Sequence, residues 1–297
     1  MKAMILAAGF GTRLRPLSEK RPKALMPVAN EPVMARNIEY LRSHGVSEII
    51  ANAHHHYGQI LEYLAGTRFG LKVDVRLETE ILGTGGGIRN TADFWDNDPF
   101  IVLNGDILTN IDLTRAYKHH LDMRPLVTMI LHDRNPYNKV KVDPQGGITD
   151  IPRAYGPKGL AFTGIHIIEP STLSYIPEGF SDIIDCYRSL IEDGRPVKGY
   201  MSEGHYWHDI GNMADYIRAN GEMSKEPFTI GARCRIDPSV SLSDWAVIGD
   251  DCRLDKGVIL GRSVLWDGIT VKEGVRITDS VVTSGAVVEH DLNREVF

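Results

Sequence analysis

Two glycines followed by several cations occupy the start of the chain. Residues 6–16 read LAAGFGTRLRP, and Pro22 and Lys23 come shortly after. Glycine lets the backbone approach a phosphate closely, so that exposed N–H groups can bind its oxygens. Arginine and lysine side chains neutralise the charge of a triphosphate. The spacing matches neither a P-loop nor the three-glycine dinucleotide fingerprint, so the segment predicts a phosphate-binding loop of another kind, with a simple tight turn as the alternative.

Two aspartates are candidates for binding a metal ion. Asp106 follows the apolar run 101–103, and Asp209 lies in the segment WHDIGN at 207–212. A carboxylate just past a buried strand is well placed to hold Mg²⁺ against a phosphate. The purely structural alternative is a turn residue or a helix cap.

A second glycine-rich segment lies at residues 78–87, which read ETEILGTGGG. Three consecutive glycines permit the close approach of a flat nucleobase or a ribose. A flexible loop is the alternative interpretation, since glycine also marks loops.

Strands and helices alternate over the first hundred residues, which indicates an α/β fold with a mostly parallel sheet. In such sheets, ligands bind beyond the carboxyl ends of the strands, where the loops 9–13 and 104–106 are expected. Apolar runs and helical spacing predict strands at 2–8, 46–52, 71–77 and 101–103, and helices at 32–44 and 58–65.

From residue 227 onward, the apolar residues recur every six positions. A period of six fits neither a helix nor a simple strand, and is typical of a hexapeptide β-helix in which three hexads form one triangular coil. The pattern then slips, with Trp266 in the seventh position and Lys272 in the eighth. The unbroken positions are Ile230, Ile236, Leu242, Ile248, Leu254 and Leu260, each followed four residues later by a smaller side chain: Cys234, Val240, Ala246, Cys252, Val258 and Val264.

This change of period predicts a catalytic domain at 1–226 and a β-helix of three to four coils at 227–297. Cys234 and Cys252 are one full coil apart, so their side chains are expected to stack inside the solenoid. Trp245 and Trp266 fall at variable or slipped positions, and we expect them to point outward and offer apolar contact area. The solenoid is therefore expected to mediate homo-oligomer contact and to carry no chemistry of its own.

The segment LAAGFGTRLRP with the Pro22-Lys23 pair resembles the signature of sugar-1-phosphate nucleotidyltransferases. This family includes mannose-1-phosphate guanylyltransferase-like enzymes and other NDP-hexose pyrophosphorylases on a Rossmann-like core. The resemblance spans roughly residues 1–220, and the tail resembles the left-handed parallel β-helix of hexapeptide-repeat proteins. It implies that a nucleoside triphosphate and a sugar-1-phosphate are the substrates and that Mg²⁺ is the cofactor.

The resemblance also implies roles for individual residues. Arg13 would hold the leaving pyrophosphate, Lys23 would bridge the phosphates of nucleotide and sugar, and Asp106 and Asp209 would hold the metal; these four form the implied catalytic set. The implied nucleotide-binding residues are Leu6, Ala8, Gly9, Gly11, Thr12, Arg13, Gly85 and Gly86. The implied sugar-phosphate residues are Lys23, Asn104, Lys139, Thr163 and Gly164, of which Thr163 and Gly164 lie in the segment AFTGI.

Two departures from the family pattern leave the sugar open. Many relatives carry Glu-Lys-Pro near residues 150–153, whereas this chain reads Asp-Ile-Pro-Arg there. Many also carry Tyr-Gly where this chain has Asn138-Lys139. Arg153 or Lys139 could supply the missing cation, and Lys139 could equally be a solvated surface residue.

Composition excludes several classes of function. The net charge of −6 and the pI of about 6.0 argue against broad nucleic-acid binding, which needs a basic face. The apolar start of the chain is too short to cross a membrane, and three cysteines without a CxxC pair fit a reducing compartment, so we expect a cytoplasmic protein. Three consecutive histidines at 54–56 are expected to form a polar loop, because neighbouring side chains on a strand point to opposite sides.

Several functional hypotheses therefore stay open. GTP with mannose-1-phosphate or a related sugar is slightly favoured, and UTP or dTTP with another hexose-1-phosphate or with N-acetylmuramate-1-phosphate is the alternative. Acyl transfer by the solenoid is disfavoured, because His290 is the only histidine in residues 227–297. A subunit that binds nucleotide-sugar without turning it over is the remaining alternative from another class.

Overall fold

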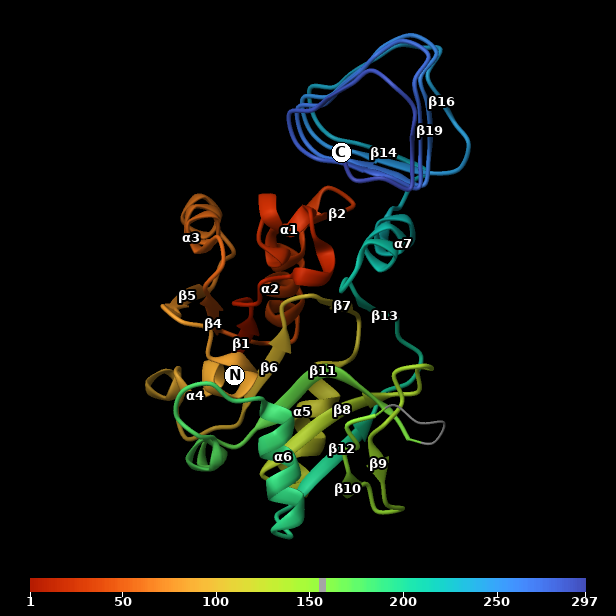
Figure 1. Cartoon of the computed structure of the whole chain (residues 1–297). Coiled ribbons are helices and arrows are strands. Elements are labelled where there is room, and N and C mark those ends of the chain that lie inside the picture. Colours follow the sequence, from red (N-terminus) through yellow and green to blue (C-terminus); the bar gives the residue numbers. More distant parts are fainter. Residues whose placement is uncertain (155–158) are drawn as a thin grey trace. The chain divides into compact units, whose positions relative to one another are not determined.

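The computed structural model describes residues 1–154 and 159–297. The chain divides into two compact units, each made from two stretches of sequence. Unit 1 comprises Met1–Phe10 and Met34–Trp207, and unit 2 comprises Gly11–Val33 and His208–Phe297. Figure 1 shows the helices and strands of both units. Among the described residues, no helix is both long enough and apolar enough to span a bilayer.

Unit 1 is built on a seven-stranded sheet with the order β12-β8-β11-β6-β1-β4-β5. Only β11 runs antiparallel to its neighbours β6 and β8, so the predicted, mostly parallel α/β sheet is confirmed. The strands are β1 (Lys2–Leu6), β4 (Glu48–Ala53), β5 (Lys72–Leu77), β6 (Phe100–Asn104), β8 (Val127–His132), β11 (Ala161–Ile168) and β12 (Val197–Met201).

The remaining elements of this part of the chain connect and cover the sheet. Asp112 and Asp182 cap the amino ends of α5 and α6, because each carboxylate accepts a hydrogen bond from a backbone N–H in the first turn. The helices predicted at 32–44 and 58–65 are confirmed as α2 and α3. The helices are α2 (Val33–Ser43), α3 (Tyr57–Gly66), α4 (Gly83–Arg89), α5 (Leu113–Met123) and α6 (Ile183–Glu192), with 3-10 turns η3 (Ala92–Phe94) and η4 (Pro170–Tyr175) and the short strands β7 (Ile107–Thr109), β9 (Lys141–Val142), β10 (Ile148–Asp150) and β13 (Trp207–Asp209).

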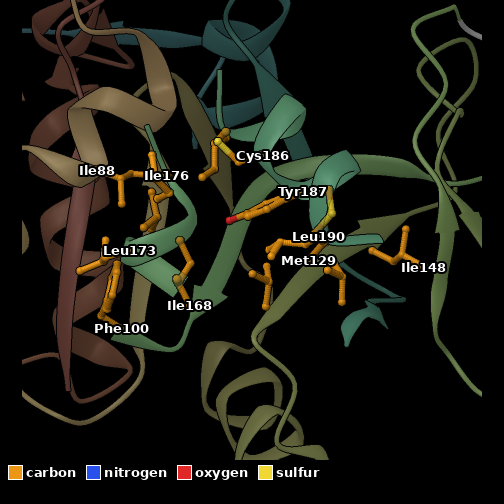
Figure 2. Close-up of a cluster of buried hydrophobic side chains, with 14 of the residues drawn as sticks. Ile88, Phe100, Met129, Ile148, Ile168, Leu173, Ile176, Cys186, Tyr187 and Leu190 are labelled. Carbon is orange, nitrogen blue, oxygen red and sulfur yellow. The ribbon is translucent and has the colours of Figure 1, made fainter. Parts of the chain in front are cut away.

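One hydrophobic core of unit 1 lies between the sheet and the elements α4, η4 and α6. Figure 2 shows Phe100 and Met129 from the strands close to Leu173, Tyr187 and Leu190. Neighbouring strand residues that point to the opposite face, among them Ile101 and Leu103, are also fully buried. Burial on both faces explains why these strands are continuous apolar runs rather than alternating ones.

The amino-terminal stretch of unit 2 packs against its single long helix, α7 (Met213–Met223). The Tyr216 hydroxyl donates to the carbonyl of Pro27, and the Asn220 side chain accepts from the N–H of Ala29. These bonds fix the turn between two short strands to the helix. The other elements are η1 (Thr12–Leu14), α1 (Leu17–Lys20), η2 (Lys23–Leu25), β2 (Pro27–Val28) and β3 (Glu31–Pro32).

The carboxyl-terminal part of unit 2 is a three-sided solenoid of parallel strands (Figure 1, blue). Three four-stranded sheets form its sides, which fits the predicted left-handed hexapeptide β-helix. The sheets are β14 (Phe228–Ile230), β17 (Ala246–Ile248), β20 (Ser263–Leu265) and β23 (Val281–Val282); β15 (Arg235–Ile236), β18 (Arg253–Leu254), β21 (Thr270–Val271) and β24 (Val287–Val288); and β16 (Ser241–Leu242), β19 (Ile259–Gly261), β22 (Arg276–Thr278) and β25 (Leu292–Asn293).

The register of the solenoid corrects the predicted slip. Ile248 pairs with Leu265, so the seventh apolar position belongs to Leu265 and not to Trp266. Leu254 pairs with Val271, which likewise replaces Lys272 as the eighth. The repeat therefore continues after the hexad between Leu260 and Leu265 has lost one residue, and the hexad between Ile277 and Val282 is also one residue short.

The side chain of Trp266 is buried, which makes its expected exposure wrong. Only 2% of the residue is accessible. Its indole N–H donates to the Tyr216 hydroxyl, and the Arg21 guanidinium lies 4.8 Å from the ring centroid. Trp266 thus anchors the solenoid to α7 within unit 2, whereas Trp245 is half-buried.

The two solenoid cysteines occupy matching positions of successive coils, next to the paired residues Arg235 and Arg253. Cys252 is buried as predicted, and burial raises the pKa of its thiol to about 11. Cys234 belongs to the first coil and is only half-buried. Each thiol donates to a backbone carbonyl of the solenoid, which indicates a packing role.

Candidate functional site

The loop that follows β1 enters unit 2 at Gly11 and closes as a 3-10 turn. Gly11 has φ +63°, and a Cβ there would lie 3.0 Å from the Ser18 side chain. The N–H of Leu14 donates to the carbonyl of Gly11, and the Leu14 side chain is buried. This turn leaves Thr12 and Arg13 exposed, as a phosphate-binding loop requires.

Three of the four predicted catalytic residues gather around Gly211 in unit 2. The Lys23 ammonium lies 3.8 Å from the nearer carboxylate oxygen of Asp209. A Cβ on Gly211 would lie 2.9 Å from that Asp209 oxygen and 3.0 and 3.1 Å from the two terminal nitrogens of Arg13. The three side chains come from η1, η2 and β13, and two cations with one carboxylate make a setting suited to binding phosphate.

Leu6, Asn104 and Asp106 lie at the carboxyl ends of two adjacent strands of unit 1. Leu6 of β1 pairs with Asn104 of β6, and the N–H of Gly105 donates to the Leu6 carbonyl. A Cβ on Gly105 would lie 2.6 Å from that carbonyl oxygen, so only glycine fits there. Asp106 follows directly, and Gly9 is exposed with open space beside it.

The strand β11 brings the predicted sugar residues to Asn104. Gly164 has φ +78°, and a Cβ there would lie 2.8 Å from the Asn104 amide nitrogen. The Thr163 hydroxyl donates to the Ile130 carbonyl, and the Thr163 carbonyl accepts from the Trp207 indole. Thr163 and Gly164 are both buried, and Gly164 packs directly against the side chain of Asn104.

The two candidate cations for the sugar phosphate have different surroundings. Lys139 is half-buried, and its backbone N–H donates to the Leu160 carbonyl beside the start of β11. The Arg153 side chain is 80% exposed and forms an ion pair with Asp185 at 3.2 Å. The backbone of Lys139 is therefore tied to the residue before β11, whereas the Arg153 side chain pairs with a residue of α6.

Sequence reasoning missed a buried polar pair that supports the end of β1. The Asn52 side chain accepts from the N–H of Ala7 and donates to Glu78, and Glu78 in turn accepts from the N–H of Leu82. Glu78 is only 2% exposed. Both residues come at the ends of predicted strands, which is the one signal in the sequence that could have singled them out.

The glycine-rich segment forms the helix α4 rather than a flexible loop. Cβ atoms on Gly85 and Gly86 would lie 2.6 Å from the Ser181 hydroxyl and 2.0 Å from the Gly179 carbonyl oxygen. Residues 179–181 therefore pack directly against these glycines. The contact of Gly85 and Gly86 with a nucleotide stays a prediction.

The histidines at 54–56 contact their own neighbours. A His54 ring nitrogen lies 2.8 Å from the Glu78 carbonyl oxygen, and Phe10 packs edge-on against His54 and His55. Within residues 1–154 and 159–297, no cluster of three or more histidine, cysteine or acidic side chains could hold a metal ion. The two predicted metal ligands, Asp106 and Asp209, belong to different units.

The sequence of this chain is similar to those of known nucleotide-transferring proteins. The sequence model of the Nucleotidyl transferase family matches residues 2–226. A UTP–glucose-1-phosphate uridylyltransferase from Synechocystis is 30% identical over 95% of this chain and 87% of its own length. A mannose-1-phosphate guanylyltransferase from Mycobacterium tuberculosis is 28% identical over 92% of this chain and 81% of its own.

Solved structures give a similar result. HddC from Yersinia pseudotuberculosis superposes with a TM-score of 0.64 and 25% identity, over 75% of this chain and 99% of HddC. A putative glucose-1-phosphate thymidylyltransferase from Bacillus anthracis has a TM-score of 0.68 at 22% identity, over 76% and 96% of the two chains, and shares the fold. With a family match that covers most of the sequence and a glycine–arginine loop at its start, this chain belongs to the nucleotidyl transferase family.

Proposed function

We propose that this protein transfers a nucleoside monophosphate from a nucleoside triphosphate to a sugar-1-phosphate and releases pyrophosphate. The observation that carries the proposal is the cluster of Arg13, Lys23 and Asp209 around Gly211, in which Arg13 directly follows the glycine loop. The names of the relatives support the same class of substrates.

In the proposed reaction, an oxygen of the sugar phosphate forms a bond to the α-phosphorus as the bond to the bridging oxygen of the β-phosphate breaks. The attacking oxygen is already anionic, so no general base is needed, and positioning and charge neutralisation supply the catalysis. Lys23 contacts phosphates of both substrates and holds them together. Arg13 neutralises the charge that develops on the departing pyrophosphate.

Asp106 and Asp209 are the proposed holders of the Mg²⁺ that the family resemblance implies. Carboxylate oxygens are the donors that this ion prefers; Asp106 lies between β6 and β7, and Asp209 is the last residue of β13. The bound ion supplies positive charge to the phosphates. Lys23 beside Asp209 would keep this carboxylate oriented in the absence of the ion.

The favoured substrates are GTP and mannose-1-phosphate, with UTP or dTTP and another hexose-1-phosphate as the alternative. The decisive experiment measures pyrophosphate release from four nucleoside triphosphates against a panel of sugar-1-phosphates. We expect one pair to exceed all others clearly. Tight binding of a nucleotide-sugar without pyrophosphate release from any pair would favour a non-catalytic subunit instead.

We also propose that the solenoid contacts a second copy of this chain. Its last coil is covered, since Leu292 is buried and Val296 bridges to Val281. Its first coil is more open, because the inward position Ile230 is 45% exposed. Light scattering at micromolar concentration tests this, and a monomer would contradict it.

The proposed location is the cytoplasm. All three cysteines are free thiols, which suits a reducing compartment. Fractionation of the native cell into cytoplasmic and external pools tests this expectation.

A further inference from the structure

A cavity of about 730 Å³ lies within unit 2 between α7 and one corner of the solenoid. Met213 and Ile217 of the helix and Trp245 of the solenoid give it an apolar wall. The charged residues that line it are Arg218, Arg262 and Arg294 together with Glu222 and Asp279. This volume falls in the range of small-molecule sites, which are mostly apolar with a few polar groups.

The indole of Trp245 is fixed against the helix. A Cβ on Gly221 would lie 2.5–2.8 Å from three atoms of the indole, so the ring fits only because this helical residue is glycine. Glycine within a helix costs about 1 kcal/mol relative to alanine. Glycine at this position lets the indole lie directly against the helix, where it forms a wall of the cavity.

The solenoid corner beside Trp245 carries a ladder of charges. Arg262 forms ion pairs with Asp244 of the preceding coil at 3.3 Å and with Asp279 of the following coil at 2.7 Å. Arg294 follows on the next coil, and Arg262 and then Arg294 lower the pKa of the Asp279 carboxyl. Arg262, Asp279 and Arg294 all have positive φ, of 45°, 50° and 58°. Such backbone is unfavourable for residues other than glycine.

Five charged side chains line the cavity, three arginines against the two carboxylates of Glu222 and Asp279, so one positive charge is in excess. Arg218 is engaged by Asp215 on its own helix. Across the described residues, the Arg294 guanidinium is the arginine of this cavity that has no carboxylate within ion-pair distance. One cation is therefore available beside an aromatic face and an apolar wall.

We propose that this cavity binds a nucleotide at a site separate from the glycine loop. The base stacks on Trp245 and contacts Met213 and Ile217, because a planar ring matches an indole face. The phosphate pairs with Arg294, because a guanidinium group binds phosphate oxygens in a fork. An inorganic anion alone would leave the apolar wall without a partner.

The helix α7 connects this cavity to the Arg13–Lys23–Asp209 cluster, and this part of the proposal rests on the proposed function. Asp209 lies four residues before the helix begins at Met213. The opposite side of the helix holds the turn at Pro27 and Ala29, which continues the segment that carries Lys23. A nucleotide against Met213 therefore changes the position of the cluster and regulates turnover.

Calorimetric titration of the full-length protein with GDP and with UDP tests the binding site. Replacing the exposed Arg294 by glutamate should reduce the number of nucleotides bound per chain by one, or weaken one site about tenfold or more. The matched control is Arg276→Glu, an exposed solenoid arginine that does not line the cavity. Unchanged binding in Arg294→Glu would overturn the proposal, whatever the glycine loop binds.

Two further measurements complete the test. Inorganic phosphate should compete with the diphosphate only weakly, and displacement at equal concentration would show an anion site instead of a nucleotide site. With both substrates saturating, added diphosphate should change the rate about fivefold or more in the wild type but not in Arg294→Glu. Binding through Arg294 without any change in rate would overturn the regulatory role.

Discussion

Alanine at Gly211 should separate catalysis from folding. The residue lies between Asp209 and the start of α7, and its φ is not in the left-handed region, so the backbone accepts a side chain. The new Cβ would meet the Asp209 carboxylate at 2.9 Å and the Arg13 guanidinium at 3.0 and 3.1 Å. Both contacts are below or near the closest approach that real Cβ atoms show, so the two side chains must move.

The size of the effect follows from which atoms must move. Carboxylate and guanidinium groups end flexible side chains, so they shift by some tenths of an ångström while the backbone stays in place. We therefore expect the free energy of unfolding to change by less than about 1 kcal/mol. A misplacement of about 1 Å at a catalytic group can cost about 10²-fold in rate, so turnover should fall roughly 10- to 100-fold.

The assay compares pyrophosphate release and urea denaturation for Gly211→Ala and a matched control. The control is Gly58→Ala in α3, where a Cβ meets nothing within 4 Å. It should retain full turnover and gain stability, because alanine favours a helix. Wild-type turnover in a folded Gly211→Ala protein would refute the role that we give to the cluster.

Three further results are expected. Asp106→Asn and Asp209→Asn should each lower turnover about 10²-fold or more while the fold survives, and near-normal turnover in the second would remove Asp209 from the metal site. Lys23→Ala should raise the KM of both substrates and lower kcat, since Lys23 is proposed to bridge them; intact constants would exclude bridging. Burial lowers the pKa of His166 from 6.5 to about 3. It stays neutral in the folded chain while the unfolded chain binds a proton, so the free energy of unfolding falls as the pH drops from about 6.5 toward 3. At pH 5 the loss is about 2 kcal/mol. Denaturant titrations at pH 7.5 and 5 should show that the free energy of unfolding falls less in His166→Gln than in the wild type. An equal fall in both proteins would contradict this cause.

Local pattern was sufficient to predict the sheet and the solenoid. Apolar runs marked β1 and β6, because residues buried on both faces of a parallel sheet must all be apolar. The period of six marked the β-helix, because each hexad forms one side of a coil. These signals depend on burial along a single segment, so the sequence contains them directly.

The candidate site could be predicted only in part. Arg13, Lys23 and Asp209 were found from their residue types and from family resemblance. Gly211 and Glu78 were not, because the role of each comes from a contact with residues distant in the sequence. A single glycine or a single glutamate is part of no sequence pattern that would predict such a contact.

The sequence by itself determined which segments become strands, helices and coils, and which residue types can bind phosphate. Tertiary structure decided the rest. Leu265 rather than Trp266 faces the solenoid interior, because the hexad between Leu260 and Leu265 is one residue short. Trp266 is buried against Tyr216, and Gly221 accommodates Trp245. Periodicity specifies which side of a segment is apolar, whereas packing between distant segments decides what covers that side.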